Sequence, residues 1–177
     1  MTADYQCSVE VVHQTFYDPG YWHGRLAETP VDIANLETML IGGESGTDGT
    51  IRVVTMQTVL SQHLPALVTQ LHRGDFCVRR EETWSPVNDG IATASIAGSV
   101  VGSPVSIWGT AVLKPNVETG GAQMTANITV QVRVPFIGGK LERLIGSQIG
   151  LLIDIEQRFT ASWLDSAEPG PAQTGHA

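Results

Sequence analysis

The chain has 177 residues, 42% of them hydrophobic and 16% charged, a balance typical of one folded domain with a single core. Ten Lys and Arg against 18 Asp and Glu give a formal net charge of −8, which argues against nucleic acid as a partner. No apolar run approaches the ~20 residues of a membrane-spanning helix, and the first residues lack the features of a signal peptide. We therefore expect a cytoplasmic protein without membrane insertion, whose Cys7 and Cys77 are reduced thiols.

The N-terminal part predicts one strand followed by two short helices. Apolar and polar residues alternate over residues 5–11, which predicts a half-buried strand. Residues 12–17 follow as a short helix that ends at Asp18-Pro19-Gly20, and residues 21–27 form a second one.

The middle of the chain predicts six strands joined mostly by short turns. Asn88-Asp89-Gly90 is a strong hairpin signal. One short helix is expected between the second and third of these strands, where leucines at helical spacing occupy residues 64–71. The strands are predicted over residues 33–41, 50–60, 76–85, 91–100, 105–114 and 122–134.

The last third predicts one long amphipathic helix. No proline occurs between residues 139 and 168, so the run would extend for roughly 40 Å. Gln148 is the one polar residue on its apolar stripe, and residues 167–177, rich in Pro, Gly and Ala, are expected to be a disordered tail. The stripe consists of Leu141, Leu144, Ile145, Leu152, Ile155, Phe159 and Trp163.

This order predicts an α+β fold in a single domain over residues 1–166. Consecutive strands with short turns favour an antiparallel sheet, and a long twisted sheet must curl. The long C-terminal helix is the one element able to cover the concave side, so we expect the sheet to wrap around it.

Several segments carry a resemblance to a known family. The opening SVEVVHQTFYDPGYWHGRL and the later LPALV, RREETW, GTAVLKP and VPFIGGKLERLIGSQ occur in order along the chain. Together they resemble the START-like superfamily, also called helix-grip, polyketide-cyclase-like or SRPBCC, and in particular an uncharacterised actinobacterial branch of it. The resemblance implies a helix-grip fold with a cavity for apolar ligands such as lipids, polyketides or sterols. Some members are cyclases or hydrolases and others only bind, and no family catalytic motif matches positions of this chain.

Two opposite charges stand out on the predicted strand 76–85. Alternation places Arg80 and Glu82 on the same face as Phe76, Val78 and Trp84. If that face is inward, the two charges face the cavity and could orient a ligand. The alternatives are a structural ion pair or a face that points to solvent. Gln148 is open in the same way: it could bind a polar group of a ligand, a backbone carbonyl or Arg80.

We expect a ligand-binding cavity with no catalytic residue, no metal and no cofactor, since no His, Cys or carboxylate shows the spacing of a zinc site. Trp108 alternates away from the apolar face, so it marks either a homodimer contact or an isolated surface tryptophan. The side chains expected to bind the ligand are Arg80, Glu82, Trp84, Met124, Ile128, Gln148, Leu152, Ile155 and Phe159, with Leu67 and Leu71 at the mouth.

Three functions are compatible with these residues. The leading hypothesis is a non-catalytic module that binds a small apolar or amphipathic molecule, such as a lipid or polyketide. The alternatives are a cyclase- or hydrolase-type enzyme and a protein-interaction module whose cavity is collapsed. A cavity carboxylate with a raised pKa would favour the enzyme, and a filled core with a large exposed patch would favour the interaction module.

Overall fold

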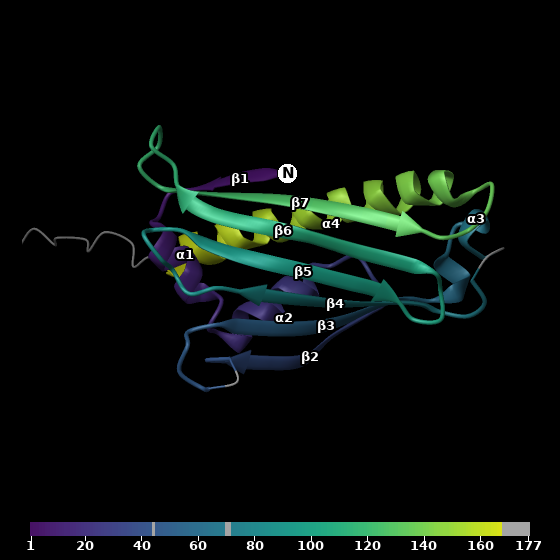
Figure 1. The fold of residues 1–177 in the computed structure, drawn as a ribbon, viewed down its shortest axis with the longest axis horizontal. Coiled ribbons are helices and arrows are strands. Elements are labelled where there is room, and N and C mark those ends of the chain that lie inside the picture. Colours follow the sequence, from purple (N-terminus) through teal and green to yellow (C-terminus); the bar gives the residue numbers. More distant parts are fainter. Residues whose placement is uncertain (44, 70–71, 168–177) are drawn as a thin grey trace, which may run out of the picture.

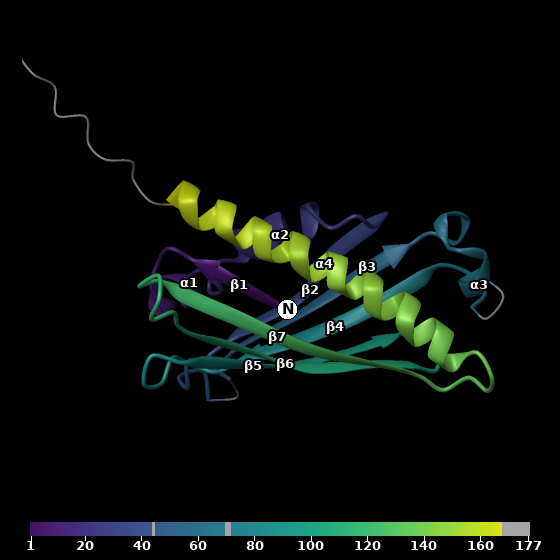
Figure 2. The ribbon, with the colours of Figure 1, turned by 90° about the horizontal axis from the view of Figure 1, so that it is seen from above.

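Seven antiparallel strands form one curved open sheet, and a long helix lies diagonally across it (Figures 1 and 2). The computed structural model describes residues 1–43, 45–69 and 72–167. The strand order is β1-β7-β6-β5-β4-β3-β2. The architecture is α+β with a helix-grip layout, as the sequence predicts.

The strands of the sheet follow the predicted boundaries to within two residues, apart from the first. The hairpin between β4 and β5 turns at Asp89 and Gly90, whose φ angles of 50° and 74° are the positive values that a tight two-residue turn needs. The remaining strands are β2 Ile33–Ile41, β3 Ile51–Val59, β4 Phe76–Trp84, β5 Ala92–Val100, β6 Val105–Pro115 and β7 Ala122–Val132.

The predicted strand over residues 5–11 is wrong. The first strand is β1 Thr2–Tyr5, which pairs with β7, and the chain then enters helix α1 Val9–Thr15. The side chain of Ser8 accepts a hydrogen bond from the backbone N–H of Val11 and so caps this helix. Buried residues recur in the helix at helical spacing, which outweighs the alternation that suggested a strand.

Two helices pack against each other at one end of the sheet. Helix α2 Pro19–Ala27 begins at Asp18, whose carboxylate accepts the N–H of Gly20, and α4 Gly138–Ala167 is the predicted long helix. Gly24 permits their close approach, because a Cβ there would lie 2.6 Å from the ring of Phe159. Between β3 and β4 the chain forms only the short helices η1 Ser61–His63 and α3 Ala66–Thr69 among the described residues.

The core consists of two clusters, one at each end of the concave face. Aromatic residues dominate the cluster near α1 and α2, whose largest members include Phe16, Tyr21, Trp22 and Trp84. Aliphatic residues form the other cluster near the start of α4, around Val100, Val105, Ile107, Val132 and Leu141. On β7, apolar side chains face these clusters and polar ones face outward, as the alternation predicts.

The buried face of α4 is rotated relative to the predicted apolar stripe. The prediction that Gln148 faces the interior is wrong, because its side chain is exposed. Leu144, Ile145 and Ile155 are only partly buried. The buried residues of α4 are Gly138, Leu141, Ile153, Glu156, Gln157, Thr160 and Leu164. The three polar ones, Glu156, Gln157 and Thr160, line a cavity between the helix and the sheet.

The observed register of α4 predicts different costs for a charge at neighbouring positions. Ile153 is 8% exposed and Leu151 is 58% exposed. We expect Ile153→Asp to lower the free energy of unfolding by roughly 3 kcal/mol or more, because it buries an unpaired carboxylate. The matched control Leu151→Asp should change it by less than about 1 kcal/mol. Urea unfolding measures both values, and equal losses would show that this face of α4 is not the buried one.

Candidate functional site

A cavity of about 80 Å³ lies between α4 and the inner face of the sheet. Small residues on three adjacent strands, Gly98, Ala111 and Ala126, leave space where larger side chains would fill the core. Most of the wall is apolar. By volume the cavity has room for about three water molecules or a small organic molecule.

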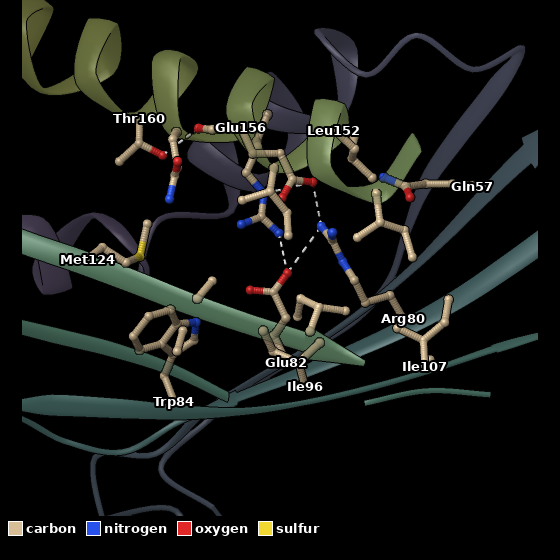
Figure 3. A pocket seen from close by; sticks show the side chains of 18 of the residues that line it. Gln57, Arg80, Glu82, Trp84, Ile96, Ile107, Met124, Leu152, Glu156 and Thr160 are labelled. Atoms are coloured by element: carbon tan, nitrogen blue, oxygen red, sulfur yellow. Dashed lines mark hydrogen bonds and ion pairs between the residues drawn. The ribbon is translucent and has the colours of Figure 1, made fainter. Parts of the chain in front are cut away.

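Three buried charged side chains and one partly buried one line this cavity, and we call them the charge network: Arg25, Glu82 and Glu156, with the partly buried Arg80. Arg25 lies 2.5 Å from Glu82, and Arg80 lies 2.5 Å from Glu156 and 3.1 Å from Glu82. Figure 3 shows Glu82 and Arg80 reaching from the sheet toward Glu156 on the helix. No side chain of the network is more than 12% exposed. The network therefore joins α2, β4 and α4 through charge-assisted hydrogen bonds.

The network holds Arg25 and Glu82 in their charged forms. Burial by itself would raise the pKa of Glu82, but Arg25 and Arg80 outweigh burial and lower that pKa from 4.5 to about 2. Burial likewise favours a neutral Arg25, yet Glu156 and Glu82 overcome it and raise the pKa of Arg25. Glu82 is thus a carboxylate at neutral pH. The network as a whole, with two cations and two anions, has no net charge.

Local structure explains how the four side chains meet. The alternation of β4 turns Arg80 and Glu82 inward, as the sequence predicts. Arg25 comes from the last turn of α2, where its guanidinium lies 4.2 Å from the ring centroid of Trp22. Sequence reasoning missed Arg25 and Glu156, because a charged helical residue is normally solvent-exposed. One feature of the sequence could have indicated them. If Arg80 and Glu82 face the interior, they need further partners to satisfy all of their hydrogen bonds.

Two buried amides also line the cavity. Gln57 on β3 is 4% exposed and Gln157 on α4 is 7% exposed. The Nε2 atom of each has no hydrogen-bond partner among the described residues. By contrast, the Tyr21 hydroxyl donates to Thr160 at 2.8 Å, and Thr160 donates to the carbonyl oxygen of Glu156. The two amides are therefore donors still available on residues of the cavity wall, as are the ring N–H of Trp84 and the Nε of Arg25 and of Arg80.

The structure brings together most, but not all, of the residues predicted to line the cavity. Phe159 packs instead against Tyr21 on α2, with ring centroids 5.8 Å apart. Ile155 and the exposed Gln148 are also not part of the cavity wall. Leu67 packs against the aliphatic core cluster, and Leu71 lies outside the described residues. The predicted residues that do line the cavity are Arg80, Glu82, Trp84, Met124, Ile128 and Leu152.

A second cavity of about 100 Å³ lies near the start of α4. Val68 and His72, from the segment predicted to form the mouth, contribute to its wall, together with Leu141 and Ile145 of α4. His72 contacts the Ser103 hydroxyl at 2.5 Å and the backbone carbonyl of Asp75 at 2.9 Å. Since a carbonyl only accepts, the Nε2 of His72 is the donor to Asp75.

Other sequence expectations have different outcomes. Trp108 is 45% exposed on the outer face of the sheet, as predicted, while the homodimer remains a prediction. Cys7 and Cys77 are not joined by a disulfide. Among the described helices, none is sufficiently long and apolar to cross a membrane. Residues 168–177, which hold nearly all of the predicted disordered tail, lie outside the described residues.

A family model described as "Protein of unknown function (DUF2505)" matches residues 1–164. The chain belongs to the DUF2505 family. Uncharacterised proteins of Mycobacterium tuberculosis and Mycobacterium bovis are 66% identical to this DUF2505 protein over 164 residues, which cover 93% of its chain and 94% of theirs.

Two solved structures share the fold. A protein from Thermus thermophilus matches with a TM-score of 0.59 and 15% identity, over 96% of this chain and 97% of its own. A conserved protein from Geobacillus kaustophilus matches with a TM-score of 0.55 and 14% identity, over 94% of this chain and 93% of its own. At these identities the two structures support the fold of the DUF2505 protein and carry no residue roles.

The network predicts that removing one charge is worse than removing an oppositely charged pair. Arg80→Met leaves an excess buried negative charge and should lower the free energy of unfolding by roughly 3–5 kcal/mol. Arg80→Met combined with Glu156→Leu leaves the pair Arg25 and Glu82 balanced, so the loss should be smaller. Arg52→Met, at the exposed ion pair with Glu81, is the control and should cost less than about 1 kcal/mol. A double variant less stable than Arg80→Met in urea unfolding would contradict this.

The lowered pKa of Glu82 predicts an acid-dependent loss of stability. Its pKa is 4.5 ordinarily and about 2 in the folded protein. Glu82 therefore contributes fully to the free energy of unfolding above pH 4.5, and this contribution is lost as the pH falls to 2. The total loss is on the order of 3 kcal/mol. Urea unfolding from pH 6 to pH 2 should show this fall in the native protein and a shallower one in Glu82→Gln. Equal pH dependence in both would mean that Glu82 is not held by the network.

Proposed function

We propose that this DUF2505 protein is a START-like binding protein that holds a small apolar or amphipathic molecule between the sheet and α4. The observation that carries the proposal is a cavity with mostly apolar walls and a few buried polar groups among them. Such a combination, an apolar surface with a few fixed polar groups, is characteristic of sites that bind small organic molecules.

The composition of the wall supports a ligand rather than a packing defect. An unfilled cavity in the core lowers the stability of a protein. If these positions served only to fill the core, larger residues would be expected in place of Ala111 and Ala126. The strands instead place small side chains opposite α4. At about 80 Å³ the cavity suits a molecule of few non-hydrogen atoms, or part of a larger one that displaces side chains.

Binding is better supported than catalysis. An enzyme of the cyclase or hydrolase type would be favoured by a cavity carboxylate with a raised pKa, ready to donate a proton. The pKa of Glu82 is lowered instead, and its charge is matched by Arg25 and Arg80. The space under α4 also weakens the case for an interaction module with a collapsed cavity.

The proposal includes the superfamily and the cellular location. The START-like assignment is supported by the helix-grip layout and by the sequence resemblance. A cytoplasmic location is in keeping with the absence of a disulfide between Cys7 and Cys77.

Native mass spectrometry of the freshly purified protein tests the proposal. We expect a non-covalent adduct that is lost on denaturation. If purification removes the ligand, we expect titration with 1-hexanol to change the NMR chemical shifts of methyl groups around the cavity. Ala126→Leu fills the cavity and should abolish both signals. The control Ala97→Leu places the same side chain on the exposed outer face of β5 and should change neither.

An absence of any adduct together with an absence of 1-hexanol binding would contradict the proposal. So would binding that persists unchanged in Ala126→Leu, because the occupied site would then be elsewhere. Circular dichroism of both variants verifies that each retains the fold.

A further inference from the structure

We propose that the cavity selects an uncharged ligand whose polar atoms are hydrogen-bond acceptors, such as the carbonyl of a ketone, ester or amide. This inference rests on the proposed binding function and specifies the chemistry of the ligand. It follows from the charge balance of the network and from the two amides without partners among the described residues.

The charge network leaves no unmatched charge for a ligand to neutralise. Arg25 faces Glu82 at 2.5 Å, and Arg80 faces Glu156 at 2.5 Å. A carboxylate or ammonium entering the cavity would add a fifth buried charge to a balanced set. Taking that charge out of water is costly, and every attraction to one network member is offset by repulsion from its partner. An uncharged ligand avoids this penalty.

The free donors indicate the polarity of the ligand. Gln57 and Gln157 each have an unpartnered Nε2 in the cavity wall, and both side chains are more than nine-tenths buried. A buried donor without an acceptor destabilises the protein, so a ligand that supplies an acceptor gains affinity there. A purely apolar ligand would leave the amides unpaired, and this disfavours an alkane relative to a carbonyl compound of the same shape.

Four compounds that share a six-membered ring separate these possibilities: cyclohexanone, methylcyclohexane, cyclohexanecarboxylate and cyclohexylammonium. Each is titrated into the protein at pH 7 and followed by methyl NMR of the cavity residues. We expect cyclohexanone to bind about tenfold or more tightly than either charged compound, and more tightly than methylcyclohexane. Gln57→Leu should remove much of the preference for the ketone over methylcyclohexane.

Changing the charge of the network should change the selectivity in a defined direction. Glu156→Gln leaves one excess positive charge and should raise affinity for cyclohexanecarboxylate relative to cyclohexanone. Arg80→Gln leaves one excess negative charge and should favour cyclohexylammonium. Glu81→Gln is the matched control, because Glu81 neighbours Glu82 on β4 but pairs with the exposed Arg52. It should leave the selectivity unchanged.

The outcomes distinguish this inference from the proposed function. If a charged ring compound binds the native cavity as well as cyclohexanone, the ligand is not selected for neutrality, although binding itself stands. Equal binding of methylcyclohexane and cyclohexanone overturns the role of the amides. If no ring compound binds, the inference falls, whereas the proposed function is decided by the native adduct and by 1-hexanol binding. Amide NMR spectra establish that Glu156→Gln and Arg80→Gln remain folded.

Discussion

A buried, electrically balanced network of two arginines and two glutamates determines how the helices sit on the sheet. Arg25 comes from α2, Arg80 and Glu82 from β4, and Glu156 from α4. A buried charge is tolerated only where its partner is correctly positioned. The network thus restricts the rotation of α4 more narrowly than apolar contacts alone would, and it keeps Glu156 and Thr160 on the inner face in place of Leu151.

The sequence was sufficient for most of the architecture and for half of the network. Strong alternation identified the inner face of β4, including Arg80 and Glu82, because a one-residue error would have exposed Trp84. The rotation of α4 was not predictable in the same way. Apolarity was taken as a guide to burial, whereas the helix buries Glu156, Gln157 and Thr160. Arg80 is the hydrogen-bond partner of Glu156, and Tyr21 is that of Thr160. Both partners are far away in sequence, so the pattern of apolar residues along the helix carries no information on them.

The cavity and the network depend on each other. Small side chains at Gly98, Ala111 and Ala126 leave space between the sheet and α4. Long side chains such as Arg80 can extend through this space and reach α4. Space and charge at this site are therefore two results of one arrangement, in which charged side chains from α2, β4 and α4 meet at an otherwise apolar chamber.

The pairing of β1 with β7 has a consequence for how the chain is made. Thr2 lies opposite Thr125, and the N-terminal ammonium donates to the carbonyl oxygen of Ala126. β1 has no neighbour in the sheet until β7 has been made, more than 100 residues later. Contacts with such large sequence separation slow folding. β1 can therefore pair only after β7 has been made, whereas β2 to β7 each lie beside a neighbour in sequence and can pair without waiting for a distant strand.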